Sequence, residues 1–122
     1  MNQLPEEIEE GNIEYKLKII PDNNSRLMSL SSQLRWRCNE GRGMAIYLLG
    51  ISDKGRVLGI TTDGLDKSIH NLGIMIRENN YRILQQTISK IANKVWASII
   101  IINDSYNNHL FITNLNDNLN SS

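Results

Sequence analysis

The chain has 122 residues, 40% of them hydrophobic, and its 13 basic side chains balance 13 acidic ones. This length suits one domain of ordinary size, and the zero net charge excludes a surface-wide field that would hold nucleic acid or an anionic membrane. The single cysteine, Cys38, excludes an internal disulfide and suits a reducing compartment. The longest apolar run, residues 99–102, is too short to cross a bilayer, and the first residues lack the pattern of a signal peptide. We therefore expect a cytoplasmic protein without membrane contact.

The first part of the chain predicts an acidic arm followed by a strand. Residues 1–12 include four glutamates, and a charge run of this kind is typical of a solvated segment. From residue 13 onward apolar and charged side chains alternate, which predicts a strand with one buried face. We expect the charged side chains, such as Glu14 and Lys16, to lie on the exposed face. The apolar set is Ile13, Tyr15, Leu17 and Ile19.

Two amphipathic helices are predicted from the spacing of apolar residues. The first follows an N-cap at Ser25 and runs to about Asn39. The second starts near Asp63 and stops at residues 79–80, with Gly73 as its weakest position. The apolar stripes are Leu27, Leu30, Leu34 and Cys38 in the first helix, and Leu65, Ile69, Leu72 and Ile76 in the second.

Residues 41–60, between these helices, predict a β-hairpin around which the chain is organised. Residues 44–52 are almost wholly apolar, so we expect a central strand with both faces covered. Residues 53–55 form the predicted turn, in which Gly55 can take a positive φ. Residues 56–61 form the predicted return strand. A structural role in the core accounts for this hairpin without any further function.

Three further strands complete the predicted fold. Residues 81–91 and 94–103 are rich in β-prone side chains and are joined by a turn at residues 92–93, while residues 109–114 form a short last strand. The order β-α-β-β-α-β-β-β predicts an α/β (α+β) fold, a two-layer sandwich of one mixed sheet and two helices. The expected division is an arm (residues 1–12), an α/β domain (residues 13–103) and a tail of linker, strand and polar residues (residues 104–122).

Two stretches of the sequence show a family resemblance. They are L-P-E-E-I-E-E-G-N-I-E-Y-K-L-K at residues 4–18 and a run over residues 36–59 with W-R, N-E-G-R-G, A-I-Y, G-I and D-x-G in order. Both resemble the N-terminal domain of the GTP-binding protein 1/2 family. The members of this family are translational-type GTPases similar to elongation factor Tu. The resemblance covers essentially the whole chain and is strongest up to about Met75.

This resemblance implies an accessory domain of an elongation-factor-like GTP-binding protein that works in translation or mRNA turnover. The implied partners are the GTPase domain of a full-length family member and, with it, tRNA, mRNA or the ribosome. GTP and Mg²⁺ are implied for intact family members only. We therefore expect no cofactor, no catalytic residue and no GTPase activity in this chain by itself.

In the resembling family a G-x-x-x-x-G-K-[ST] phosphate loop stands where this sequence ends. Aligned with it, Asn114 and Leu119 fall on the glycines, Asn120 on the lysine and Ser121 on the Ser/Thr, with Asp117 between the glycines. Such a loop needs glycine so that backbone N–H groups can approach the phosphates, and lysine to reach them. We expect a degenerate loop without a functional GTP site, and a polar tail with a chance alignment explains the same residues.

A small basic cluster, Arg35, Trp36, Arg37 and Arg42, is the candidate RNA contact. The arginines would meet phosphates and the indole ring would stack on a base. The alternative is a solvated helix end, in which the arginines complement the helix dipole and Trp36 packs on the sheet. Both interpretations stay open at this point.

A second resemblance leads to a different class of function. The hairpin preceded by a Glu-x-Lys strand is similar to the AlbA-like modules of schlafen proteins, which implies a stand-alone RNA-binding or metal-dependent RNA-cleaving module. Glu9, Glu14, Lys16 and Asp53 would then imitate its carboxylates and lysine, with a divalent metal activating the phosphate. The charged face of a half-exposed strand and an ordinary turn explain these residues without chemistry.

The remaining candidate residues favour structural roles. His70 and His109 lie far apart in the sequence and have no partner at metal-ligand spacing, so we expect no metal site. Cys38 lies on the apolar stripe of the first helix and has no neighbour that favours a thiolate, so we expect a small core residue.

Overall fold

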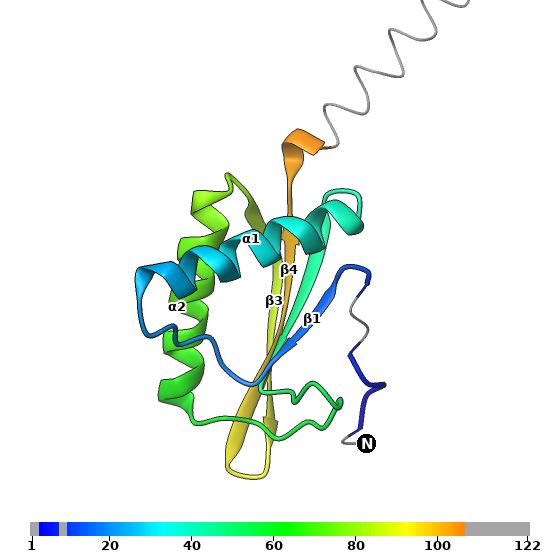
Figure 1. The fold of residues 1–122 in the computed structure, drawn as a ribbon. Helices are drawn as coiled ribbons and strands as arrows, with labels where there is room; N and C mark the ends of the chain where they lie inside the picture. The colour runs from blue at the N-terminus through cyan, green and yellow to red at the C-terminus, as the bar shows by residue number, and fades with distance from the viewer. Residues whose placement is uncertain (1–2, 8–9, 107–122) are drawn as a thin grey trace, which may run out of the picture.

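The computed structural model describes residues 3–7 and 10–106, which form two layers (Figure 1). The strands make one mixed sheet in the order β1-β2-β4-β3. β1 runs parallel to β2, and the other two neighbouring pairs are antiparallel. The predicted fold class, an α/β sandwich of a mixed sheet and two helices, is confirmed. The elements are β1 (Ile13–Lys16), α1 (Asn24–Glu40), β2 (Met44–Leu49), α2 (Thr62–Glu78), β3 (Arg82–Ile91) and β4 (Lys94–Ile102).

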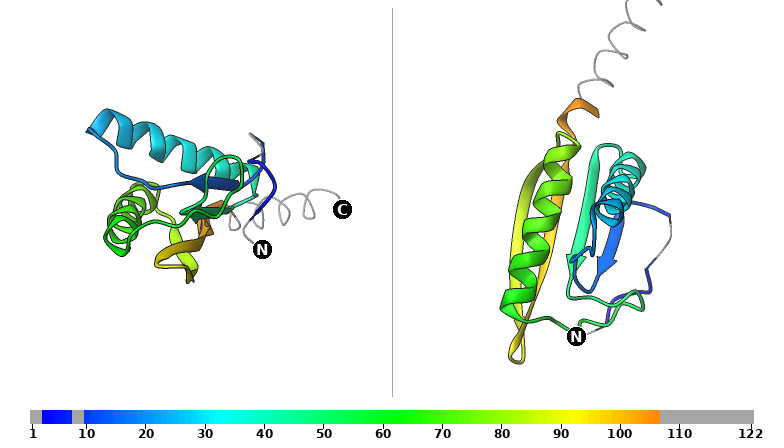
Figure 2. Two further views of the ribbon diagram at one scale, coloured as in Figure 1. Left: turned by 90° about the horizontal axis from the view of Figure 1, so that it is seen from below. Right: turned by 60° about the vertical axis from the view of Figure 1, so that its left-hand side comes forward.

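Both helices pack on the same face of the sheet (Figure 2), and the core lies between them and the strands. The apolar stripes predicted for α1 and α2 are confirmed, because Leu30, Leu34 and Cys38 of α1 are buried against Leu72 and its neighbours in α2. Burial of these stripes supplies the main stabilisation of a domain of this size. None of the helices in the described part is both long and apolar enough to cross a membrane.

The N-caps of the helices differ from the predicted ones. Asn23 caps α1, with its Oδ1 accepting from the backbone N–H of Arg26 at 2.8 Å, and Ser25 lies inside the helix. Thr61 caps α2, with its Oγ1 accepting from the backbone N–H of Gly64 at 3.0 Å. In each case the N-cap is two residues before the predicted one. Its backbone is extended, and its side-chain oxygen accepts a hydrogen bond from a backbone N–H of the first turn.

The predicted return strand at residues 56–61 is replaced by isolated bridges. Val57 pairs with Ile51, and Ile60 pairs with Val95 of β4. Gly50 and Gly59 have φ of +87° and +73°, so the backbone turns away from an extended path on both sides of the hairpin. The turn itself is as predicted, with Gly55 at a φ of +88°. The predicted last strand, residues 109–114, lies outside the described residues.

The apolar side of β1 faces away from the helices, which corrects the expected orientation. Glu14 is only 2% exposed on the helix side, whereas Ile13 is 43% exposed. The physical reason is Arg37 of α1, which comes from above the sheet and binds the Glu14 carboxylate. A charged side chain can be buried when it is paired in this way.

The sheet face away from the helices, here called the open face, is mostly apolar over β1, β2 and β4 and lacks a covering element among the described residues. In β2 the helix-facing Tyr47 and Leu49 are fully buried, while Ile46 and Leu48 alternate with them and stay partly exposed. The expectation that both faces of residues 44–52 are covered is therefore wrong for the described part of the chain. The apolar part of the open face consists of Ile13, Tyr15, Met44, Ile46, Leu48, Trp96, Ile100 and Ile102, and the same face continues with the polar side chains of Ser98 in β4 and of Gln85, Thr87 and Ser89 in β3.

Candidate functional site

The guanidinium of Arg37 lies inside the protein at the centre of a charged cluster. We call Arg37, Glu14, Lys16 and Glu7 the Arg37 cluster. The Arg37 and Glu14 side chains are 4% and 2% exposed, and Arg37 Nε donates to Glu14 Oε2 at 2.6 Å. Lys16 Nζ lies 3.2 Å from the other oxygen of Glu14, so both carboxylate oxygens are engaged. Such charge-assisted contacts compensate for the loss of water around the buried ions.

The same guanidinium also fastens the acidic arm to α1. One terminal nitrogen of Arg37 donates to the backbone oxygens of Glu10 and Gly11, at 3.2 and 2.9 Å. The other terminal nitrogen is 4.0 Å from Glu7 Oε2. A planar guanidinium can hold several acceptors at once, which suits a position where three chain segments meet.

Glu7 connects the arm to the outer edge of β1. Its carboxylate accepts a hydrogen bond from the backbone N–H of Tyr15. Burial raises the pKa of Glu7, and the nearby Glu14 charge adds to this rise, while the Tyr15 N–H, Arg37 and Lys16 oppose it. The carboxylate therefore takes the place of a neighbouring strand at this edge of the sheet.

Residues 3–7 lie against the turn of the hairpin, so the backbone of this part of the arm is anchored, while Gln3, Pro5 and Glu6 are exposed as expected. The backbone N–H of Leu4 donates to Gly55 O at 2.7 Å, and that of Glu7 donates to Asp53 O at 2.9 Å. A Cβ at Gly55 would come within 2.2 Å of Leu4 O, so only glycine allows the arm this close.

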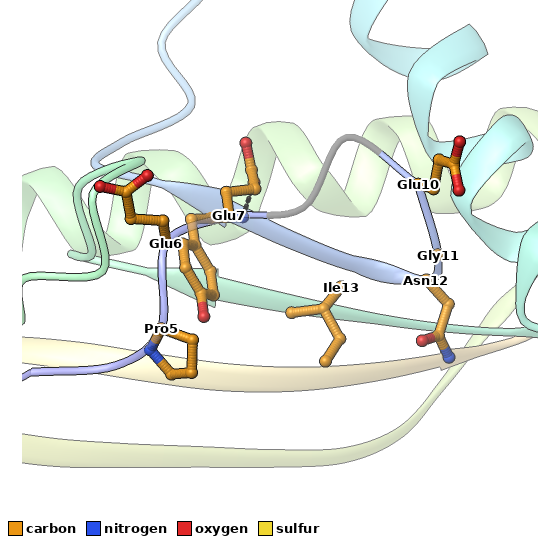
Figure 3. A pocket seen from close by; sticks show the side chains of 8 residues that line it. Pro5, Glu6, Glu7, Glu10, Gly11, Asn12 and Ile13 are labelled. Atoms are coloured by element: carbon orange, nitrogen blue, oxygen red, sulfur yellow. Dashed lines mark hydrogen bonds between the residues drawn. The ribbon is translucent and has the colours of Figure 1, made fainter.

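A cavity of about 230 Å³ lies between the arm and β1 (Figure 3). Its walls combine carboxylates with the apolar side chains of the open face. Three of the lining residues are glutamates and none is cationic, which disfavours phosphate, so this cavity does not suit nucleic acid. The lining residues are Pro5, Glu6, Glu7, Glu10, Gly11, Asn12, Ile13 and Tyr15.

Tyr47 lies in the core on the helix-facing side of β2. Its side chain is fully buried, and its hydroxyl has no hydrogen-bond partner within the described part of the chain. Burial raises the pKa of Tyr47, and the charge of Glu14 adds to the rise. The phenol is therefore neutral. Glu14 is already bound by Arg37 and Lys16, so Tyr47 serves as part of the core.

The structure does not bring the predicted RNA cluster together on the surface. Arg37 turns inward, and its guanidinium carbon lies 4.9 Å from the ring centre of Trp36, which is 43% exposed. Arg35 is exposed and donates to Asn79 Oδ1 and Ser32 Oγ. Arg42 is exposed in the loop after α1 with a φ of +54°. The Trp36 face is thus partly occupied by the protein's own cation.

The residues expected for metal-dependent chemistry are likewise dispersed. Glu14 is bound to Arg37 and Lys16, and Asp53 lies exposed in the hairpin turn. The part of the chain that the structure describes contains no group of three side chains that could hold a metal ion. His70 is exposed on α2. Glu9, His109 and the phosphate-loop positions Asn114, Asp117, Leu119, Asn120 and Ser121 lie outside the described residues.

Cys38 is a core residue, as predicted. Its side chain is fully buried beside Leu34, and burial raises the pKa of its thiol. A protonated, inaccessible thiol is a poor nucleophile.

Comparison with known proteins confirms the resemblance to GTP-binding protein 2. The chain is 34% identical over 101 residues to GTP-binding protein 2 of Homo sapiens and of Mus musculus, which covers 83% of this chain but only 14% of each relative. An uncharacterised protein of Acanthamoeba polyphaga mimivirus is 26% identical over 101 residues, covering 82% of this chain and 47% of the viral protein. No family model matches the chain, and no solved structure matches it.

Proposed function

We propose that this chain is a non-catalytic accessory domain of a GTP-binding protein, and that its open face docks on the GTP-binding part of such a protein. The observation that carries this proposal is the 34% identity over 101 residues to GTP-binding protein 2. The uncovered apolar face of the sheet supplies the docking surface.

The register of the strands places the apolar side chains of the open face next to one another. Ile13 of β1 lies beside Ile46 of β2, which lies beside Ile100 of β4. The row ends in the polar Gln85 of β3. An antiparallel sheet with a solvated face has polar side chains there, so an isoleucine row across three of the four strands is typical of a face that packs on another layer. Lys94 at the β3–β4 turn, and Arg82 with its partner Asp104, provide charges near the ends of β4. An apolar centre with a charged rim is the usual composition of a protein interface.

The length of the relatives supports this choice of partner. The matched segment is 14% of GTP-binding protein 2, so in that relative the segment stands beside a much longer chain. A domain linked to its partner meets it at a high effective concentration, which makes a moderate apolar surface sufficient. The cytoplasmic role in translation or mRNA turnover, with tRNA, mRNA or the ribosome as further partners, belongs to this proposal through the elongation-factor-like resemblance.

The Arg37 cluster supports an accessory role over the RNA-cleaving alternative. A metal-dependent nuclease needs carboxylates that are open to a cation. Glu14 instead has both oxygens bound by Arg37 and Lys16. The cluster holds the arm, β1 and α1 together, so its geometry suits a structural role.

The test is a chimera in which this chain replaces the matched segment of human GTP-binding protein 2. Oxidative footprinting then compares Met44 on the open face with Met28, a matched control that is 65% exposed on α1. We expect Met44 to be oxidised several-fold more slowly in the chimera than in the isolated chain, whereas Met28 reacts equally in both.

Equal oxidation of Met44 in the two proteins would show that the GTP-binding part does not cover the open face. Sedimentation of the isolated chain supplies the second arm. A dimer that protects Met44 and dissociates on Ile46→Lys would assign the face to a second copy and overturn the proposal.

A further inference from the structure

A second cavity, of about 150 Å³, lies at the opposite end of α1 from the Arg37–Trp36 region. It is formed where the segment after β1 meets the first turn of α1. Three of the side chains that line it are cationic, Lys16, Lys18 and Arg26, against the one carboxylate of Asp22. Its buried floor is apolar, with Ile19 at 1% and Leu30 at 6% exposure.

Two of the three cations of this cavity take no part in the ion pairs of the described residues. Lys18 and Arg26 are exposed, and neither belongs to an ion pair among the described residues. Lys16 is the exception, because its ammonium lies 3.2 Å from Glu14 while its side chain remains 20% exposed. A cavity with two unpaired cations and one carboxylate attracts an anion, because the positive charges are not balanced by the protein itself.

The placement of Arg26 strengthens this interpretation. It occupies the first turn of α1, where the helix dipole is positive and an acidic side chain is favourable, yet this turn contains no acidic residue. In contrast, the first turn of α2 carries Asp63, which pairs with Lys67 at 3.2 Å. A cation placed against the local field is a local cost to the fold, and an anion bound beside it would offset this cost.

We propose that this cavity binds a phosphate group, through Lys18 and Arg26 with Lys16 behind them. Arginine offers a planar pair of donors to phosphate oxygens, and lysine adds a mobile point charge. The cavity is large enough for one phosphate, and its cations recognise the anion and not the rest of its carrier. That carrier is either a small phosphorylated compound or the backbone of an RNA strand. The site lies at the other end of α1 from the cluster expected to contact RNA, and it does not depend on the docking proposal.

The first experiment titrates the ¹⁵N-labelled full chain with sodium phosphate at constant ionic strength, with sodium chloride as the reference anion. We expect saturable shifts of the amide signals of Lys18 and of residues 24–26 with phosphate alone. The double variant Lys18→Gln/Arg26→Gln should bind phosphate at least about tenfold more weakly, the effect of losing one charge-assisted hydrogen bond. The matched control, Lys67→Gln on α2, should bind as the unmodified chain does.

A variant that gains affinity shows that a change in phosphate binding comes from the site and not from a loss of folding. Asp22→Asn removes the one carboxylate of the cavity and should strengthen phosphate binding, by roughly fivefold or less for a solvent-screened charge. Shifts that are equal for chloride and phosphate, or an unchanged affinity in the Lys18→Gln/Arg26→Gln variant, would overturn the proposal.

The second experiment identifies the carrier by fluorescence anisotropy of a labelled single-stranded RNA oligomer. RNA binding that inorganic phosphate displaces, and whose salt dependence flattens by about 0.7 per cation removed, assigns the site to a backbone phosphate. Phosphate binding without RNA binding assigns it to a small phosphorylated compound. The double variant can also lose phosphate binding and keep RNA binding. In that case the RNA uses another surface, and this cavity is again assigned to a small compound.

Discussion

Arg37 and Glu14 stabilise the protein as a pair, and each is costly without the other. Arg37→Met would leave a carboxylate that is 2% exposed with Lys16 as its remaining partner. We expect this variant to lose about 3–5 kcal/mol of unfolding free energy, as is usual when one partner of a buried ion pair is removed. The double variant Arg37→Met/Glu14→Leu should lose much less than the sum of the two single changes. Urea unfolding of the three variants measures this coupling.

Additive losses in that cycle would show that Arg37 acts through its contacts with the arm and not through Glu14. The backbone oxygens of Glu10 and Gly11 are the acceptors that would then matter. The conservative variant Arg37→Lys distinguishes the two, because an ammonium can approach Glu14 but cannot hold all three acceptors together.

The pH dependence of stability should report on Glu7. Burial raises its pKa above the ordinary value of 4.5, so the folded protein holds this proton more tightly than the unfolded chain does. The stabilisation from protonated Glu7 is fully present below pH 4.5 and declines as the pH rises through the folded-state pKa. The unfolding free energy of the unmodified chain, relative to Glu7→Gln, should therefore fall as the pH is raised from about 4 to 7.

Urea unfolding at several pH values within this range tests the sign of the Glu7 effect. A difference that grows with pH would mean that the hydrogen bond from Tyr15 and the charge of Arg37 outweigh burial. His70→Gln is a suitable control for titration of an exposed group elsewhere in the molecule.

The burial of Arg37 has a signal in the sequence, and the burial of Glu14 does not. Arg37 follows Leu34 by three residues and precedes Cys38, so the helical period places it on the buried side of α1. For β1 the alternation separates two faces without saying which one meets a helix. That choice depends on Arg37, which is 23 residues further along the chain. The alternation therefore separates the two sets correctly. Within β1 the buried side chain is Glu14 instead of Ile13, whereas Ile19, beyond the strand, is buried as predicted.

At the scale of elements, the two faces of β2 should differ in their contribution to stability. Leu49 is fully buried against the helices, whereas Ile46 is partly exposed on the open face. Leu49→Ala should cost about 2–5 kcal/mol, the usual range for a large-to-small change in a core. Ile46→Ala in the isolated chain should cost about 1 kcal/mol, because part of its surface is already in water.

The measurement for this pair is the unfolding free energy of the two variants in urea. Equal losses would show that the open face is covered even in the isolated chain. Met28→Ala, which changes a side chain that is 65% exposed, serves as the reference for a surface position.

Most of the elements could be predicted from periodicity, and the exceptions have local causes. The helix stripes repeat over several turns, so the signal from Leu65 to Ile76 survives Gly73. The return strand was expected because its residues are apolar and β-prone. Positive φ at Gly50 and Gly59 decides against it, since both Leu58 and Gly59 donate their N–H groups to the Gly50 oxygen. Two successive donors on one acceptor form a kink that strand propensity does not reveal.

At the scale of the whole molecule, we predict that the isolated chain does not bind GTP. Leu119 and Asn120 stand where a phosphate loop requires glycine and lysine. Calorimetry with GTP and Mg²⁺ should show no heat of binding, with intact human GTP-binding protein 2 as the reference protein. A micromolar dissociation constant, about −8 kcal/mol, would contradict the prediction.

The position of β4 in the sheet determines when the chain can fold during its synthesis. β4 lies between β2 and β3, and residues 94–102 are the last strand of the described chain to be made. Before they leave the ribosome, α1 and the β1–β2 pair have been synthesised, but β2 has no antiparallel neighbour and the core lacks Ile99 and Ile101. The nascent chain must therefore wait with the apolar faces of β2 and the two helices exposed, and nearly the whole domain then assembles in one step. Slower translation downstream of residue 102 would lengthen the time available for this step, whereas a pause before residue 94 would prolong the exposure of an incomplete sheet.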